Sequence, residues 1–199
     1  MNKHFTYISH FLDVLTKHSK ILFVLILLST FSPTPAVSQE YLPNAAIGQL
    51  KPAPLINIKN AYRTFPGILT GGQPSSVQLH AAKQAGYKTI VNLRPAYEHR
   101  GQVEAASVKA AGMRYIHIPV AGAEGINFKN SERLREALAN INNYPIMVHC
   151  ASGNRVGALF ALDAFQHNQL STKQAISVGK KSGLTSLEAK VLKILTETK

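Results

Sequence analysis

The stretch YPIMVHCASGNRVGALFALDAF, residues 144–165, holds the only cysteine of the chain and decides the fold. An apolar run after Pro145 ends at Cys150, and four small or polar residues lead from there to Arg155 and a second apolar run. A short apolar run bounded by turn residues is typical of a buried strand, and a longer one of a helix. The stretch therefore predicts a strand, a tight turn and a helix, with Cys150 at the junction.

Strand and helix patterns alternate along the chain outward from this stretch. Residues 70–75 (TGGQPS) are typical of a turn, and Ser75 is placed to cap a helix that runs to Ala85 and ends at Gly86. Further strands are predicted at 88–94, 114–120 and 146–150, and further helices at 103–111, from Ser131 onward and at about 155–166. The alternation predicts an α/β fold with a mainly parallel central sheet flanked by helices. Such sheets bind ligands at the carboxyl ends of their strands, where Cys150 lies.

Two more helices are predicted near the C-terminus. Ser171 and Gln174 have the spacing of a capping box, and Thr185 with Glu188 repeats it as T-x-x-E. We expect both helices to pack as ordinary amphipathic elements, without a part in the chemistry.

Residues 1–38 are predicted to form a signal peptide. A basic flank precedes the apolar run ILFVLILLSTF (21–31), which is too short to span ~30 Å of hydrocarbon, and small residues at 36–38 offer a cleavage site before Gln39. We therefore expect an exported, periplasmic protein without a stable membrane span after cleavage, whereas an uncleaved signal would tether it to the membrane. Residues 39–60, rich in proline, are predicted as an extended lead-in, and 61–199 as the folded domain.

The charge of the chain indicates an anionic partner. The formal charge is +12 over 199 residues, and loss of residues 1–38 lowers it by two. The basic residues are spread along the chain without a dense cluster or aromatic interleaving, which argues against nucleic acid. An anionic substrate, either phosphorylated or a sulfur donor, fits this charge. A single thiol in an oxidising compartment has no internal disulfide partner, so Cys150 is expected to be either buried and inert or exposed and reactive.

The residues after Cys150 have the composition of an anion-binding loop. Ala151, Ser152, Gly153 and Asn154 must turn tightly between strand and helix, and glycine and asparagine tolerate the positive φ that such a turn needs. Successive N–H groups and the positive end of the helix then face an anion, and the same field favours the thiolate form of Cys150. Arg155 adds a guanidinium suited to bidentate contact with oxyanions. The alternative is a buried cysteine at a strand end with an arginine on the surface nearby.

The motif VHCASGNR resembles the His-Cys-x-x-Gly-x-Arg signature of the beta-lactamase hydrolase-like phosphatase domain. This family is a bacterial branch of the protein tyrosine and dual-specificity phosphatase superfamily. The segments GGQPS, TIVNLRP, AAGMRYIHIPV and GKKSGL also resemble the family, in the same order, so that the likeness extends over residues 61–184.

The resemblance implies a cysteine-dependent phosphatase that works through a phosphocysteine intermediate. Cys150 is then the nucleophile, Arg155 the clamp on the phosphoryl oxygens, and His149 the residue that orients the cysteine and supports its thiolate. The backbone of residues 151–154 would hold the remaining oxygens, and no metal or cofactor is implied. The spacing of His80, His99, His117 and His167 is also unlike that of metal ligands.

Three departures from the superfamily pattern bear on activity. Four residues separate Cys150 from Arg155 where ordinary tyrosine phosphatases have five. The two aspartates of the chain, Asp13 and Asp163, are badly placed for a general acid, which leaves Glu124 as the tentative acid or as a solvated loop carboxylate. Val156 stands where many phosphatases carry a serine or threonine.

Two other functions fit the same loop. A rhodanese-like sulfurtransferase would carry a persulfide on Cys150 and would need neither the acid nor the hydroxyl. A non-catalytic anion-binding or redox-sensing domain is the second alternative. Arg94, at the end of its predicted strand, would either line the pocket or form a salt bridge with Glu98.

Overall fold

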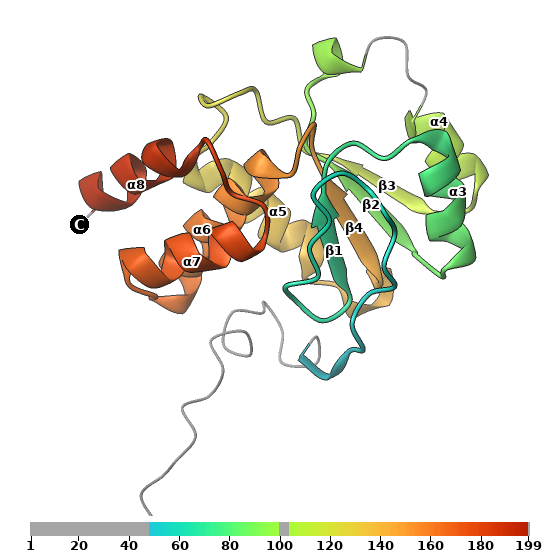
Figure 1. Ribbon diagram of the computed structural model, residues 1–199, viewed down its shortest axis with the longest axis horizontal. Coiled ribbons are helices and arrows are strands. Elements are labelled where there is room, and N and C mark those ends of the chain that lie inside the picture. Colours follow the sequence, from blue (N-terminus) through green and yellow to red (C-terminus); the bar gives the residue numbers. More distant parts are fainter. Residues whose placement is uncertain (1–47, 100–103, 199) are drawn as a thin grey trace, which may run out of the picture. The chain divides into compact units, whose positions relative to one another are not determined.

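The computed structural model describes residues 48–99 and 104–198, so the predicted signal peptide and the first part of the lead-in lie outside the described residues. A four-stranded sheet forms the centre, in the order β1-β4-β2-β3 (Figure 1). All three neighbouring pairs are parallel, which confirms the predicted α/β fold with its parallel sheet. The strands are β1 (Ile68–Gly71), β2 (Thr89–Asn92), β3 (Arg114–His117) and β4 (Ile146–His149).

Strands β1, β2 and β4 are buried on both faces, whereas the edge strand β3 is partly exposed. Successive strand residues point to opposite sides of the sheet. Ile68, Val91 and Val148 belong to one apolar cluster, whereas their neighbours Leu69, Ile90 and Met147 belong to a second. The first cluster is covered by α5 (Phe128–Leu138), α6 (Asn154–Asn168), α7 (Thr172–Lys181) and α8 (Glu188–Glu197). The second is covered by α3 (Ser76–Gln84) and α4 (Glu104–Ala110), as Figure 1 shows. Because helices cover both faces of the sheet, the buried strands consist of nearly continuous apolar residues.

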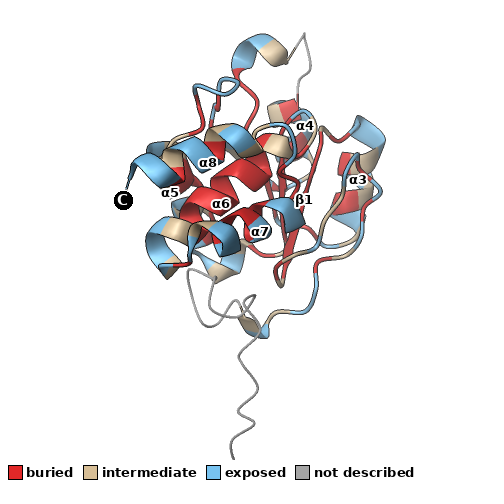
Figure 2. Cartoon of the chain, turned by 60° about the vertical axis from the view of Figure 1, so that its left-hand side comes forward, coloured by how far each residue is buried: buried red, intermediate tan, exposed pale blue. Residues whose placement is uncertain are grey.

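Helix α6 is the most deeply buried helix of the first layer. Its residues from Arg155 to Ala164 are buried, and Figure 2 shows it red between helices whose outer faces are exposed. Gly157 lets α6 approach the segment after α7 closely, since a Cβ there would lie 2.1 Å from the backbone nitrogen of Leu184. This contact fixes the start of α6, and with it the loop that follows Cys150.

Two short 3-10 helices and the described part of the lead-in complete the domain. The 3-10 helix η2 (Ala96–Glu98) follows β2, and η3 (Ile141–Asn143) precedes β4. Ala53, Ile56 and Ile58 of the lead-in pack into the second apolar cluster. Within the part of the chain that the structure describes, none of the helices is both long and apolar enough to cross a bilayer.

The first strand corrects the sequence interpretation. The composition of residues 70–75 predicts a turn, but Thr70 and Gly71 belong to β1, which pairs with β4 in register. The reason is a long-range contact. Pairing with β4 satisfies the backbone N–H and C=O groups of β1, so this segment forms a strand although turn residues follow it directly.

Two predicted helix starts were wrong, whereas two were confirmed. Helix α5 begins at Phe128, because Asn127 caps it by accepting from the N–H of Asn130 at 2.9 Å, and Ser131 lies inside the helix. Helix α8 begins at Glu188 without a side-chain cap, so Thr185 does not form the predicted capping box. The capping boxes of Ser75 with Gln78 and of Ser171 with Gln174 are both formed.

Candidate active site

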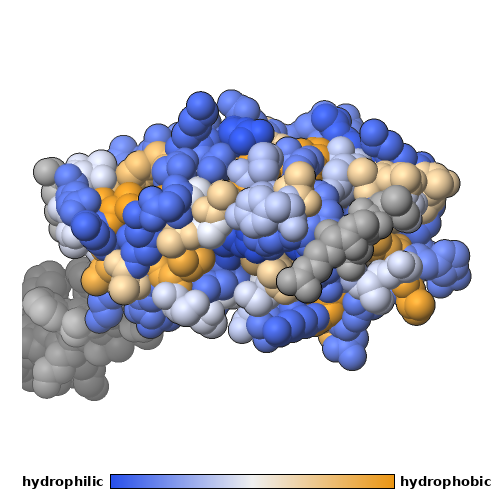
Figure 3. All heavy atoms as spheres, turned by 90° about the horizontal axis from the view of Figure 1, so that it is seen from above, coloured by the Kyte–Doolittle hydropathy of each residue, from blue (hydrophilic) through white to orange (hydrophobic). Residues whose placement is uncertain are grey.

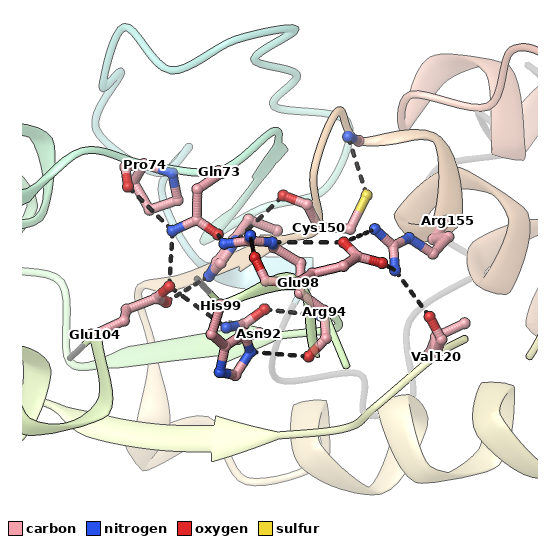
Figure 4. Close-up of polar contacts among 12 residues, drawn as sticks. Gln73, Pro74, Asn92, Arg94, Glu98, His99, Glu104, Val120, Cys150 and Arg155 are labelled. Atoms are coloured by element: carbon pink, nitrogen blue, oxygen red, sulfur yellow. Dashed lines mark hydrogen bonds and ion pairs between the residues drawn. The ribbon is translucent and has the colours of Figure 1, made fainter. Parts of the chain in front are cut away.

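Cys150 lies directly after β4, at the carboxyl end of the sheet. The residue is 1% exposed, and its N–H donates to the carbonyl of Gly71 at 3.2 Å. The N–H of Gly153 donates to the sulfur of Cys150 at 3.1 Å. A sulfur that accepts a backbone N–H at the beginning of a helix has the surroundings in which thiolates occur. Cys150 is a member of the first apolar cluster, and its sulfur faces the loop N–H from which it accepts a hydrogen bond (Figure 4). The predicted burial of Cys150 is therefore confirmed, and its exposure is not observed.

The loop after Cys150 turns its carbonyls away from the sulfur. Gly153 takes φ 89° as the residue before α6, a conformation that favours glycine. The carbonyl of Ala151 accepts from the N–H of Gln73 at 3.4 Å, and that of Ser152 from Asn60 Nδ2 at 2.9 Å. Among the described residues, no protein group accepts from the N–H groups of Ser152, Asn154 or Arg155. These N–H groups, called the cradle below, are available to an anion, and anion binding by them stays a prediction.

The side chain of Asn154 faces away from the cradle. Its Oδ1 accepts from the N–H of Thr185 at 2.8 Å, and its Nδ2 donates to Ser186 Oγ at 2.7 Å. The N–H of Thr185, which the side chain of Glu188 would need in a capping box, is therefore already used by Asn154. Asn154 therefore offers only its backbone to an anion, and its side chain anchors the segment before α8.

The guanidinium of Arg155 is held at one end and leaves the other end available. Nη1 donates to Glu98 Oε1 at 2.9 Å and to the carbonyl of Val120 at 2.8 Å, and Nη2 donates to Glu98 Oε2 at 2.7 Å. A guanidinium has five N–H donors, so Nε–H and the second Nη2–H remain. Burial opposes the charge of Arg155, but the hydrogen bond to Glu98 and the nearby sulfur of Cys150 raise its pKa above the ordinary value.

Glu98 links the two arginines of the site, and Figure 4 shows its carboxylate between them. Besides the contacts with Arg155, its Oε2 lies 3.5 Å from Nε of Arg94. The hydrogen bond from Arg155 lowers the pKa of Glu98 below its ordinary value, burial works against this, and the charges of Arg155 and Arg94 add to it. Glu98 is therefore ionised and positions Arg155. The sequence interpretation named it only as a partner for Arg94.

Arg94 acts on the site through Glu98. It is 8% exposed, and the predicted salt bridge with Glu98 is formed. Its guanidinium also donates to Gln73 Oε1 and to the carbonyl of Glu98. Arg94 therefore braces the segment that carries Glu98.

A buried pair below the cysteine, His149 and Glu104, was missed in the sequence. His149 Nε2 lies 2.7 Å from Glu104 Oε1, and Glu104 Oε2 accepts from Gln73 Nε2 at 2.7 Å and from Asn92 Nδ2 at 3.4 Å. Burial opposes the ionised form of Glu104, but the hydrogen bond and charge of His149, with help from Gln73 and Arg94, outweigh it and lower the pKa of Glu104. Glu104 thus fixes the imidazole of His149 beside Cys150. No local pattern signals this contact, because 45 residues separate the two.

The remaining predicted residues differ in their surroundings. Glu124 is exposed in the turn after Val120, and only its backbone carbonyl has a partner among the described residues, Asn127 Nδ2 at 3.5 Å. Val156 is fully buried in the first apolar cluster, so its position offers no hydroxyl to the site. His99 and His117 both contact the carbonyl of Arg94, at 3.1 and 2.7 Å. Within the described chain, no group of three or more His, Cys, Asp or Glu side chains is arranged to hold a metal ion.

The surface around this end of the sheet is polar. Figure 3 views the molecule from the side on which η2 lies, and hydrophilic residues cover most of that face. Such a surface suits a polar, charged substrate.

Fold and site together define a cysteine-dependent phosphatase-like α/β domain. The family model of the beta-lactamase hydrolase-like protein, phosphatase-like domain, matches residues 70–166 of the chain. Beta-lactamase hydrolase-like protein of Xylella fastidiosa is 29% identical over 120 residues, which are 58% of this chain and 27% of the relative. The protein of that name in Agrobacterium fabrum is 28% identical over 127 residues, 62% of this chain and 29% of the relative. The matches thus span under a third of these curated relatives.

Solved structures show the same fold. A DUF442 protein from Shewanella putrefaciens, described as a phosphatase candidate, superposes with a TM-score of 0.54 at 24% identity, over 70% of this chain and 88% of that one. The core catalytic domain of the PP-IP phosphatase SIW14 from S. cerevisiae gives a TM-score of 0.51 at 18% identity, over 71% and 88% of the two chains. Both likenesses concern the fold.

Proposed function

We propose that this protein is a phosphatase that hydrolyses phosphomonoesters through a phosphocysteine intermediate on Cys150. The observation that supports the proposal best is the orientation of Arg155. Glu98 and Val120 occupy one end of its guanidinium, and the two donors that remain, Nε–H and one Nη2–H, lie on one edge. That edge can hold two oxygens of a phosphoryl group beside the sulfur of Cys150.

The reaction has two steps. The thiolate of Cys150 attacks phosphorus, an S–P bond forms, and the P–O bond to the leaving group breaks while a general acid protonates the leaving oxygen. Water then attacks phosphorus, the S–P bond breaks, and phosphate leaves with the thiolate restored. Arg155 and the free N–H groups of Ser152 and Asn154 meet the charge of the transferring group in both steps.

Glu124 is the general acid in this proposal. The other carboxylate of the site, Glu98, is unsuited because both of its oxygens accept hydrogen bonds from Arg155. Glu124 lies on the turn that begins after Val120, and the carbonyl of Val120 contacts Arg155. The proposal requires a movement of this exposed turn that brings the carboxyl of Glu124 to the leaving oxygen.

The proposed substrates are small phosphoesters or phosphorylated envelope components. The formal charge of +12 favours anions. Export through residues 1–38 is part of the proposal, and a protein in the periplasm meets few phosphorylated proteins.

The test compares the full chain with Cys150→Ser and Arg155→Lys, each with an aryl phosphate and, separately, with thiosulfate and cyanide. We expect phosphate release that both substitutions abolish or nearly abolish, since lysine keeps the charge but lacks the two-donor edge. Arg133→Lys, at an exposed arginine of α5, is the matched control and should retain activity. Thiocyanate release without phosphate would establish the sulfurtransferase instead. If neither phosphate nor thiocyanate were released, the result would favour a non-catalytic binding or sensing domain.

A further inference from the structure

A basic cavity lies at the end of the sheet opposite Cys150. Its volume is about 350 Å³, at the lower end of the range for small-molecule sites. The cavity lies where β2 and β3 begin. Its lining residues are Lys83, Gly86, Tyr87, Lys88, Thr89, Gly112, Arg114, Asn142 and Asn143.

A repeated piece of sequence builds this cavity. AGYKT (85–89) and AGMRY (111–115) each end a helix with glycine and place a cation at or next to the first strand residue. Gly86 and Gly112 take φ of 88° and 70°, which turns the chain from helix to strand. The strands are then joined in register, since the N–H of Arg114 donates to the carbonyl of Lys88 at 2.8 Å. Arg114 pairs in register with Thr89, so the two cations lie one position apart at the start of neighbouring strands.

The positive charge of the cavity has no acidic counterpart. No carboxylate lines it, and among the described residues neither Lys83, Lys88 nor Arg114 forms an ion pair. Lys83 reaches across to Gly112, where a Cβ, if the residue had one, would lie 3.5 Å from its Nζ. Arg114 donates weakly to Asn143 Oδ1 at 3.4 Å. Three exposed cations thus line one cavity, and its lining residues include no carboxylate.

A buried hydroxyl in the same lining also lacks a partner. Thr89 is fully buried, and its Oγ1 makes no hydrogen bond within the described chain. Buried polar atoms are nearly always hydrogen-bonded, so such an atom calls for an explanation. Because Oγ1 is enclosed on all sides, a ligand in the cavity does not reach it, and the cations of the lining alone carry the site.

We propose that this cavity binds a phosphate-bearing anion at a site separate from Cys150. Three cations suit a multiply charged oxyanion better than a single carboxylate, and guanidinium and ammonium groups both bind phosphate oxygens. Thr89 pairs with Ile146, four residues before Cys150, so the strands hold the two sites roughly 13 Å or more apart. The proposal does not depend on the proposed phosphatase activity.

The test follows backbone amide signals of the full chain by NMR during titration with pyrophosphate at constant ionic strength. We expect the amides of Gly86, Lys88 and Gly112 to shift and saturate, independently of the amide of Gly153 at the cysteine loop. Lys88→Gln or Arg114→Gln should weaken this binding about tenfold or more, because each removes a charge-assisted contact. Lys173→Gln, at an exposed lysine of α7 outside the cavity, should leave the binding unchanged.

Thr89→Val provides a second control. It removes the unpartnered, enclosed hydroxyl, so the free protein should keep or gain thermal stability, while the rise in Tm caused by pyrophosphate should stay the same. Sedimentation with phosphatidylglycerol vesicles, blocked by Lys88→Gln or Arg114→Gln, would assign the phosphate to a lipid headgroup, and binding of pyrophosphate alone would assign it to a soluble ligand. Shifts confined to the Gly153 loop, or an equal weakening by Lys173→Gln, would overturn the proposal.

Discussion

Replacement of Glu98 by glutamine should disable the arginine of the site without unfolding the domain. Glu98 accepts two charge-assisted hydrogen bonds from Arg155, at 2.9 and 2.7 Å. Glutamine keeps one acceptor oxygen, but its amide N–H₂ then faces a guanidinium N–H, so at least one of the two bonds is lost. A hydrogen bond to a charged group contributes about 1.5–3 kcal/mol.

This loss should appear in the rate, because Arg155 must stay oriented while charge moves to the leaving group. If most of the lost free energy concerns the transition state, kcat/KM for an aryl phosphate falls about 10- to 100-fold. Arg155 still has its contact with the carbonyl of Val120 at 2.8 Å, so some activity should remain. The assay measures kcat and KM of Glu98→Gln beside those of Glu136→Gln, a matched change at an exposed position of α5.

An opposite effect competes with this one, since the negative charge of Glu98 also repels an anionic substrate near Arg155. If repulsion dominated, Glu98→Gln would raise kcat/KM, most clearly at low salt. A rise, or an unchanged kcat/KM in a variant with unchanged Tm, would refute the positioning role.

Three further predictions concern the acid, the buried pair and helix packing. Glu124→Gln should slow alkyl phosphate hydrolysis about 100-fold or more and aryl phosphate hydrolysis much less, because aryl leaving groups need little protonation; equal rates on both would remove Glu124 as the acid. The folded pKa of Glu104 lies below its ordinary value of 4.5, so its stabilisation is present above that pH and is lost as pH falls through the folded pKa. Glu104→Gln should therefore unfold more easily at pH 7, and its free energy of unfolding, followed with urea, should fall less on acidification than that of the parent. Gly157→Ala should destabilise the domain by about 1–3 kcal/mol in the same assay, since the new Cβ meets backbone atoms at 2.1 and 2.6 Å.

Local signals in the sequence were enough for much of the site. Cys150 and Arg155 are joined by a loop of four residues, so a strand pattern on one side and a helix pattern on the other already place them together. Gly153 likewise marks the positive φ of the turn, because glycine adopts it at little cost. Ser75 and Ser171 mark their helix starts through glutamines three residues on. In each case the deciding contact lies within a few residues.

The missed features depend on distant contacts. Glu98 meets Arg155 across 57 residues and Glu104 meets His149 across 45, and a single glutamate in a polar segment carries no sign of either partner. Strand β1 exists because β4 lies beside it, although its own sequence leads into glycines. Ser131 was a reasonable helix start, but its hydroxyl bonds instead to the carbonyl of Leu159 at 2.9 Å, and Asn127 caps the helix.

The shortened loop is compatible with phosphoryl transfer because of where α6 begins. One residue fewer between cysteine and arginine removes about 3.3–3.6 Å of chain, which at first suggests that the arginine cannot reach. However, α6 starts at Asn154, directly after Gly153 turns the chain, so Arg155 stands in the first turn of the helix. Side chains of a helix lean toward its N-terminus, and a long side chain in the first turn therefore extends back over the loop. Hydrogen bonds to Glu98 and to the carbonyl of Val120 then hold the guanidinium near the sulfur. Contacts from outside the loop therefore position Arg155, although the loop is one residue shorter.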